Sequence, residues 1–148
     1  MPQEEVCKPF ALISIKPRYA DLFLEGTKVY EYRKRSMRRL LGMDTLIYAT
    51  YPRCKIVGKM VLMDETFGFK DRIWGLTDTG AGILWWEYKK YYEGYEYAYA
   101  GCFDSVQAIK GPTLDEIKDR LKDRQWVPPQ SWIFFNGHAK QRKGWGLE

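Results

Sequence analysis

One short segment, residues 28–35, limits the possible folds more than any other part of the chain. It alternates like a strand, yet both of its faces carry charge. The two parities hold these side chains: Lys28, Tyr30, Tyr32 and Lys34 on one, and Val29, Glu31, Arg33 and Arg35 on the other. Burying a charged side chain is costly unless it is paired. Neither face can therefore enter a core without partners, and the segment is predicted to lie at a sheet edge or along the wall of a cleft.

The residues ahead of this segment predict a buried strand followed by a short helix. Residues 10–15 form an apolar run rich in strand-forming side chains, and Pro17 ends it. Proline suits the first turn of a helix, apolar residues recur at helical spacing over residues 17–25, and Gly26 supplies a C-terminal stop. The charged segment thus comes directly after a strand and a helix.

Three more strands are predicted between turns, over residues 45–50, 54–67 and 95–110. Gly58 in the second of them indicates a bulge or a sharp bend, a device that small barrels use where they close. Residues 70–80 are polar and rich in turn formers, and we expect them to form a connection. About five strands interrupted by short helices favour a small α+β barrel over alternating βαβ units.

Two further helices are predicted, over residues 83–92 and 114–122. The first contains Trp85 and Trp86, which we expect mostly in the core because the helix is apolar. Thr113 is suited to begin the second helix as the N-terminal member of a capping box.

The length of the chain predicts one domain over residues 1–148, with a core over about residues 10–135 and a basic C-terminal tail over residues 136–148. Hydrophobic residues make up 45% of the sequence and charged residues 29%, which is typical of a folded chain and excludes a disordered one.

The sequence predicts no membrane segment, export leader, metal site or cofactor. No apolar run approaches the roughly 20 residues needed to cross a bilayer, and Glu4 and Glu5 stand where a leader would carry basic residues. Three cysteines, odd in number and widely spaced, fit reduced thiols and a cytoplasmic location better than a disulfide framework. His138, the only histidine, has no carboxylate or cysteine nearby in the sequence that would complete a metal site.

Positive charge is concentrated in the first third of the chain. The net charge is +5, and between Lys16 and Arg39 eight basic residues face three acidic ones. Such a run indicates a polyanionic partner, although a solvated face is the alternative for any charge run. Aromatic residues make up 16% of the chain, some of them for the core and others available to stack on bases.

Several segments together resemble the ASCH family. They are Ser-Ile-Lys-Pro over residues 14–17, Gly-Thr-Lys-Val-Tyr-Glu-Tyr-Arg over residues 26–33, and Leu-Ile-Tyr-Ala-Thr over residues 46–50. The family signature Gly-x-Lys-x-x-Glu-x-Arg is matched in full by residues 26–33, and residues 128–132 are similar to a family element that packs beside the cleft. The resemblance covers the chain from Phe10 to about Phe135, and it implies a PUA-like β-barrel of five to six strands whose relatives bind RNA.

We therefore expect a basic and aromatic cleft that binds RNA or another nucleic acid, with a modified nucleoside among the options. Its predicted residues are Ser14, Lys16, Lys28, Glu31, Arg33, Arg35, Tyr48, Ser131 and Trp132. Lys28 and Arg33 are suited to grip phosphate oxygens. Glu31 is expected either to orient Arg33 or to accept hydrogen bonds from a base.

Plainer interpretations stay open for several of these residues. Lys16 also fits a solvated strand end, and Tyr48 and Trp132 also fit core packing. Gln130 and Ser131, which follow two prolines, fit either the mouth of the cleft or a simple terminal turn.

The sequence favours a binding module over an enzyme. A ribonuclease is the first alternative, with Lys28 and Glu31 as catalytic groups acting on the 2′-hydroxyl and the phosphate of the substrate. A nucleoside amidohydrolase is the second, but in that family pattern a threonine stands where this chain has Glu31. A protein-interaction module, using the tyrosine-rich stretch 88–99, is the third. The oligomeric state is not predicted.

Overall fold

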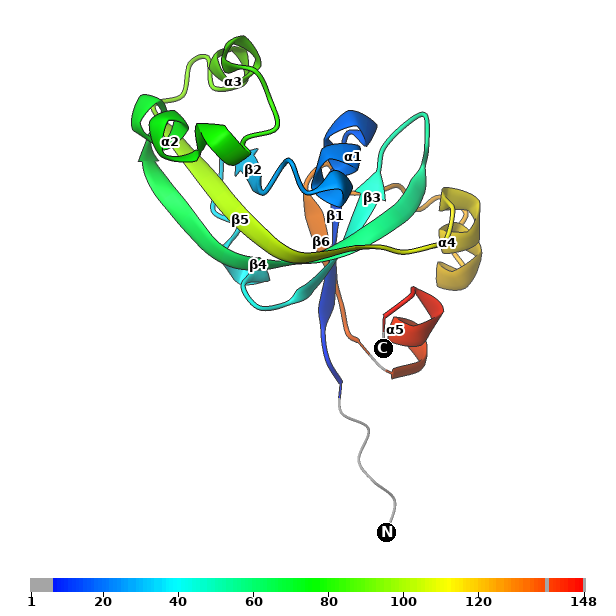
Figure 1. The fold of residues 1–148 in the computed structure, drawn as a ribbon. Helices are drawn as coiled ribbons and strands as arrows, with labels where there is room; N and C mark the ends of the chain where they lie inside the picture. The colour runs from blue at the N-terminus through cyan, green and yellow to red at the C-terminus, as the bar shows by residue number, and fades with distance from the viewer. Residues whose placement is uncertain (1–6, 138, 148) are drawn as a thin grey trace.

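The computed structural model describes residues 7–137 and 139–147, and over this part of the chain it contains six strands and five α-helices (Figure 1). In chain order they are β1 (Phe10–Ile15), α1 (Pro17–Glu25), β2 (Tyr30–Arg33), β3 (Asp44–Ala49), β4 (Lys55–Phe69), α2 (Lys70–Thr77), α3 (Trp85–Tyr91), β5 (Tyr97–Ala108), α4 (Leu114–Leu121), β6 (Trp132–Phe135) and α5 (Ala139–Gly144).

The strands form one mixed sheet in the order β2-β5-β4-β3-β1-β6. Only β1 and β3 pair in parallel, and the other neighbouring strands pair antiparallel. Figure 1 shows the long strands β4 and β5 curving together beneath α1. The α+β class and the number of strands are as predicted. Closure into a barrel is not seen, because no ladder between β2 and β6 is present in the described residues.

β1 is buried along its whole length because the sheet is covered on both faces there. Ile13 packs into one hydrophobic cluster with Phe23 of α1, while Leu12 packs into a second cluster on the other face. A continuous apolar run is typical of a strand with two covered faces. Pro17 begins α1 as predicted, and Gly26 ends it in the left-handed region with φ 87°.

A bulge lies beside Gly58, as the sequence indicates. Ile47 of β3 pairs with Gly58, but the next residue, Tyr48, pairs with Ile56, so β4 carries one extra residue there. A Cβ atom at Gly58 would lie 2.8 Å from the Leu24 side chain of α1. The same atom would lie 3.0 Å from the backbone carbonyl oxygen of Gln107, so a side chain at this bend would force both neighbours to shift.

The prediction for residues 70–80 is wrong, since the segment begins with helix α2. The prediction failed because the sequence of this helix has no strong apolar period. Only two of its side chains, Ile73 and Thr77, are buried. The helix is fixed by packing, in that Ile73 joins a third hydrophobic cluster with Tyr88 and Ala98. Contacts with residues far along the chain override weak local preference here.

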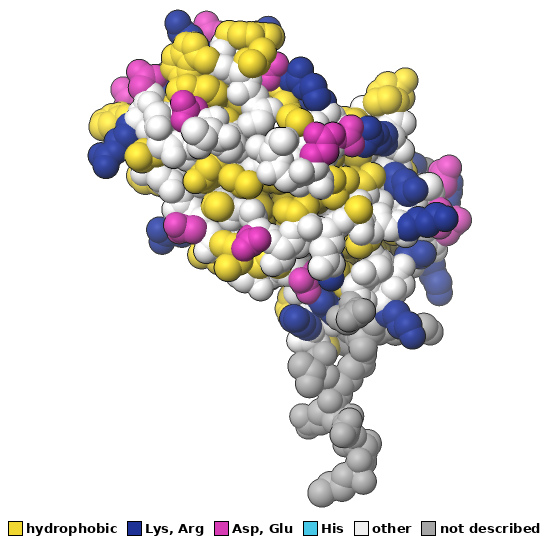
Figure 2. Space-filling model, in the orientation of Figure 1, with side chains coloured by type: hydrophobic (Ala, Val, Ile, Leu, Met, Phe, Trp, Pro, Cys, Tyr) yellow, Lys and Arg dark blue, Asp and Glu magenta, His cyan; other side chains and the backbone are white. Residues whose placement is uncertain are grey.

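Trp85 and Trp86 are not in the core, which corrects the expectation for the predicted helix at 83–92. Tyr88 and Tyr92, four residues apart, take the buried side of α3. The two tryptophans are left on its outer side, 43% and 61% exposed respectively. Figure 2 shows hydrophobic side chains gathered at the surface over α3.

The C-terminal residues extend the core beyond the predicted limit at residue 135. Trp145 is 3% exposed and its ring lies 4.8 Å from that of Phe135, which in turn stacks on Phe10 of β1. Leu147 is buried in the same cluster. Residues 145 and 147 therefore belong to the cluster that contains Leu12, on the face of the sheet opposite α1, which we call the outer face.

Residues 7–137 and 139–147 contain neither a candidate membrane span nor a cluster of metal-ligating side chains. No helix in this part is both long and apolar enough to cross a membrane. No group of three or more His, Cys, Asp or Glu side chains in it is arranged to hold a metal ion. His138 lies outside the described residues.

Candidate functional site

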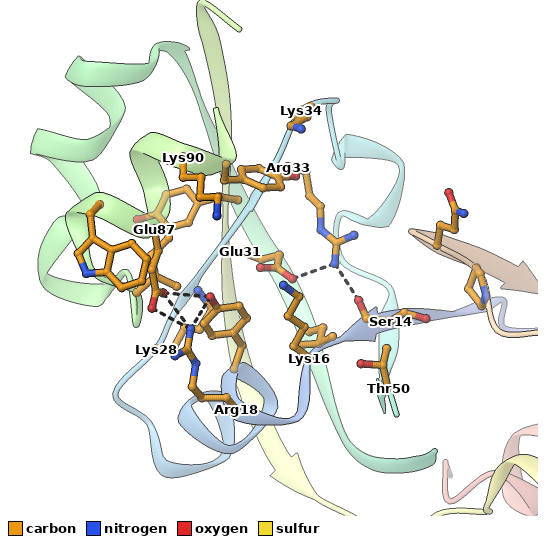
Figure 3. A pocket seen from close by; sticks show the side chains of 18 residues that line it. Ser14, Lys16, Arg18, Lys28, Glu31, Arg33, Lys34, Thr50, Glu87 and Lys90 are labelled. Atoms are coloured by element: carbon orange, nitrogen blue, oxygen red, sulfur yellow. Dashed lines mark hydrogen bonds and ion pairs between the residues drawn. The ribbon is translucent and has the colours of Figure 1, made fainter. Parts of the chain in front are cut away.

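A pocket of about 870 Å³ opens between the end of β1, the start of α1, the edge strand β2 and helix α3 (Figure 3). We call it the basic pocket. Six cationic side chains line it, against two carboxylates, Glu31 and Glu87. The cations are Lys16, Arg18, Lys28, Arg33, Lys34 and Lys90. Its volume falls within the range of small-molecule binding sites.

Glu31 and Arg33 form a mostly buried ion pair on one side of β2. Nη2 of Arg33 donates to Oε2 of Glu31 at 2.9 Å and to the carbonyl oxygen of Ser14 at 2.9 Å. The second bond links edge strand β2 to β1, which lies near the other edge of the sheet. The Glu31 carboxylate thus places a fixed acceptor beside the Arg33 guanidinium. It holds the guanidinium plane at the pocket wall (Figure 3).

Lys28 lies at the inner end of the basic pocket and is only 1% exposed. Its Nζ donates to the carbonyl oxygen of Ala81 at 2.5 Å, and the rings of Tyr19, Phe23 and Tyr32 surround it at 5.3, 5.4 and 5.3 Å. Burial lowers the pKa of Lys28 to about 8. In about a tenth of the molecules the Lys28 side chain is then a neutral amine at pH 7.

Close passage of the chain around residues 80–82 produces this burial. A Cβ atom at Gly82, where φ is 67°, would lie 2.6 Å from Cβ of Lys28. A Cβ atom at Gly80 would lie 2.5 Å from the Val29 side chain. The Gly-Ala-Gly sequence at 80–82 lets the backbone cover Lys28 and supply the carbonyl that accepts from it. The sequence analysis did not identify this segment.

A second polar network joins α1 to α3 at another wall of the basic pocket. Nη2 of Arg18 donates to both carboxylate oxygens of Glu87 at 2.9 Å, and the Tyr19 hydroxyl donates to Oε2 of Glu87 at 3.0 Å. Burial raises the pKa of the Tyr19 hydroxyl, so it stays protonated as a donor. Arg18 and Glu87 were missed because they are 69 residues apart in sequence.

Three lysines remain available to a ligand. Lys16, Lys34 and Lys90 are exposed, and none of them pairs with a carboxylate of the described residues. Lys34 lies over the rings of Tyr91 and Tyr95 at 4.6 and 4.5 Å. Because the two pocket carboxylates are both engaged by arginines, the lysines give the pocket an unbalanced positive charge. This arrangement is suited to an anion.

Five of the predicted site residues line the basic pocket, namely Ser14, Lys16, Lys28, Glu31 and Arg33. They come from two segments that the fold brings together, the end of β1 and the signature around β2. Oγ of Ser14 is buried and has no hydrogen-bond partner among the described residues. The structure therefore gathers the core of the predicted site.

The other four predicted residues do not line it. Tyr48 is 1% exposed because its side chain packs in the cluster on the outer face of the sheet. Trp132 packs against the inner cluster, and Arg35 lies on the surface just after β2 ends. Ser131 is not among the pocket residues, and its carbonyl oxygen accepts a hydrogen bond from the backbone N–H of Ser14 at 3.0 Å.

Residues 129 and 130, next to Ser131, line the pocket in its place. Gln130 is exposed at this position, so of the two polar residues that follow the prolines Gln130 lines the pocket and Ser131 does not.

Comparison with known proteins gives one curated relative and several solved structures. No family model matches the chain. The chain is 30% identical over 132 residues to the ASCH domain-containing ribonuclease of Zymomonas mobilis subsp. mobilis, which covers 89% of this chain and 88% of the relative. The crystal structure of the Zymomonas mobilis ASCH protein matches with a TM-score of 0.81 at 28% identity, over 90% of this chain and 91% of that one.

Two further structures agree with that fold. A tyrosine-to-phenylalanine variant of the Zymomonas mobilis protein matches with a TM-score of 0.82 at 28% identity, over 90% of this chain and 94% of that one. The N-terminal domain of Staphylothermus marinus McrB matches with a TM-score of 0.52 at 9% identity, over 93% of this chain and 92% of that one, which is a likeness of fold alone.

Proposed function

The chain belongs to the ASCH domain family, and on that premise we propose that it binds RNA in the basic pocket. The observation that carries the proposal is the set of three lysines, Lys16, Lys34 and Lys90, left without carboxylate partners among the described residues around one hollow. The Zymomonas mobilis relative is named a ribonuclease, which supports RNA as the nucleic acid. As part of the same proposal we assign the curved sheet to the PUA-like barrel group.

The pocket side chains suit a phosphate and its base in different ways. Arg33 is already held by Glu31 and by the Ser14 carbonyl, so little side-chain entropy is lost when its planar group meets a phosphate. The three lysines add point charges that tolerate varied phosphate positions. Trp86 and Tyr91 line the same pocket and offer apolar rings to a base.

Binding of labelled single-stranded RNA over a salt series tests the proposal. For single strands, log K falls by about 0.7 per phosphate contact for each unit of log salt concentration. We expect a steep salt dependence that becomes shallower in a Lys16→Ala/Lys34→Ala variant. A Lys110→Ala variant, which removes an exposed lysine outside the basic pocket, serves as the control. A flat salt response would instead favour a protein-interaction module.

Ribonuclease activity is a second candidate, favoured by the relative's name and by the buried Lys28 beside Glu31. In such a reaction the substrate's 2′-oxygen bonds to the adjacent phosphorus and the bond from phosphorus to the 5′-oxygen breaks. Glu31 would take the proton from the 2′-hydroxyl, and the Lys28 ammonium would return one to the departing 5′-oxygen. The product is a 2′,3′-cyclic phosphate, and Arg33 would stabilise the charge on the phosphorane.

This second candidate has a direct test. End-labelled RNA should be cleaved to cyclic-phosphate products, while the same sequence with 2′-deoxy sugars should remain intact. Lys28→Met, which keeps an unbranched side chain one atom shorter and without charge, and Glu31→Gln should each abolish cleavage. Thermal unfolding of each variant shows whether it still folds. RNA that stays intact with the wild-type protein would remove the enzymatic role and leave the binding role in place.

A further inference from the structure

A second hollow lies directly beside the basic pocket. Its volume is about 320 Å³, and it shares two lining residues, Trp86 and Lys90, with the basic pocket. Lys70, Lys89 and Glu93 also line it. Shared residues mean that the two hollows meet along one ridge of the surface.

Helical geometry explains why α3 separates the hollows. Successive residues turn by about 100°, so residues three or four apart lie on one side of the helix. Glu87 and Tyr91 face the basic pocket, while Tyr88 and Tyr92 face the core. The side chains at 86 and 90 lie between the two hollows and form the ridge.

The ridge carries an aromatic ring that the fold does not use. Trp85 packs against Trp74 and Tyr88, with ring centroids 5.4 and 6.0 Å apart. Trp86, in contrast, stacks on no aromatic ring of the described residues and is the more exposed of the pair. An indole in this position offers a free face to a flat ligand group.

The second hollow is also positively charged, with three lysines against one glutamate. Nζ of Lys70 donates to the Tyr92 carbonyl at 3.2 Å, which fixes the ammonium group of this lining residue. Lys89 is exposed and has no ion pair with a described carboxylate. Lys90, on the ridge, reaches both hollows. Cationic groups thus continue from the basic pocket over α3.

We propose that one single-stranded RNA segment spans both hollows, with a base stacked on Trp86 and the following phosphate held by Lys89 and Lys70. The inference rests on the proposed RNA binding and narrows its substrate class to a strand of at least two nucleotides. A free base face is needed to stack on the indole, which excludes a paired duplex at this point. A short strand crossing the ridge gains contacts that a mononucleotide cannot make.

Comparing ligands of two lengths isolates the second hollow. We expect uridine monophosphate to bind in the basic pocket, which has six cationic lining residues against three in the second hollow, whereas a single-stranded RNA hexamer is long enough to cross the ridge. Lys89→Ala should weaken hexamer binding several-fold and reduce its salt slope by about 0.7, as expected for the loss of one phosphate contact. It should leave binding of the monophosphate unchanged. Trp86→Ala should weaken hexamer binding roughly tenfold, in the range found for base stacking.

Lys110→Ala is the matched control, because Lys110 is an exposed lysine that lines neither hollow. Equal effects of Lys89→Ala and Lys110→Ala on hexamer binding would overturn the inference. If Lys34→Ala still weakened the hexamer in that case, RNA binding in the basic pocket would stand. A hexamer that fails to bind the wild-type protein would remove both the proposed function and the inference.

Discussion

At Lys28 the chain holds an ammonium group where burial works against its charge, so stability should depend on pH. The folded-state pKa of about 8 lies below the value of 10.5 for an unperturbed lysine. Between these values the unfolded chain binds more protons than the folded one, and stability rises with pH. From pH 7 to pH 9.5 this one group should add about 2 kcal/mol to the free energy of unfolding.

Denaturant unfolding of the wild type and of Lys28→Met at both pH values measures this contribution. Other titrating groups, including the tyrosines, are common to both proteins, so their effects cancel in the difference. The wild type should gain on the variant as pH rises. Parallel pH profiles would mean that the lysine is not buried as the contacts of Nζ indicate.

At Arg33 the shape of the side chain should matter more than its charge. Arg33→Lys keeps the net charge, but an ammonium group cannot reproduce the planar fork of donors beside Glu31 and the Ser14 carbonyl. We expect RNA affinity to fall roughly tenfold, which corresponds to about 1.4 kcal/mol. The reverse exchange at an exposed pocket residue, Lys34→Arg, should change affinity little. Equal effects of the two exchanges would contradict an orienting role for Glu31.

Among the connecting elements, the segment at 80–82 should tolerate no side chain at its last position. Gly82 and Gly42 both have left-handed backbones, with φ of 67° and 70°, so alanine is strained at either by about 1 kcal/mol. A Cβ atom at Gly82 also meets Lys28, whereas at Gly42 nothing lies within 4 Å. Gly82→Ala should therefore lower the denaturation midpoint more than Gly42→Ala, and it alone should weaken RNA binding.

Among the elements, β2 and α1 could be predicted from the sequence, whereas α2 and the segment at 80–82 could not. Alternation with charge on both faces predicted β2 at a sheet edge or cleft wall, and it lies at an edge. Pro17 and Gly26 predicted the two ends of α1. Those features are local, because each depends on neighbours within a few residues. Helix α2 and the cover over Lys28 depend on contacts with distant residues, which no local spacing encodes.

For the molecule as a whole, the sequence predicted the fold class and the pocket residues from β1 and the signature. It did not predict the pocket residues at the contact between α1 and α3. Ser14, Lys28 and Arg33 were found because one signature and one strand end carry them. Arg18 and Glu87 meet only because α3 folds back onto α1. Their positions in the chain carried no signal that could have paired them.

The cluster on the outer face of the sheet, which includes Trp145, is separate from the basic pocket. Trp145 packs on Phe10 and Phe135 in the cluster on the outer face of β1, whereas the basic pocket lies at the C-terminal end of that strand. Removing a large aromatic side chain from a packed cluster costs roughly 3 to 5 kcal/mol. Trp145→Ala should thus lower the free energy of unfolding by that amount, measured by denaturant titration. Val127→Ala, at an exposed position, should have little effect. At temperatures where Trp145→Ala is still fully folded, its RNA affinity should equal that of the wild type, because the cluster and the lining of the basic pocket have no residue in common among the described residues. A loss of affinity without unfolding would mean that the two faces of the sheet are coupled.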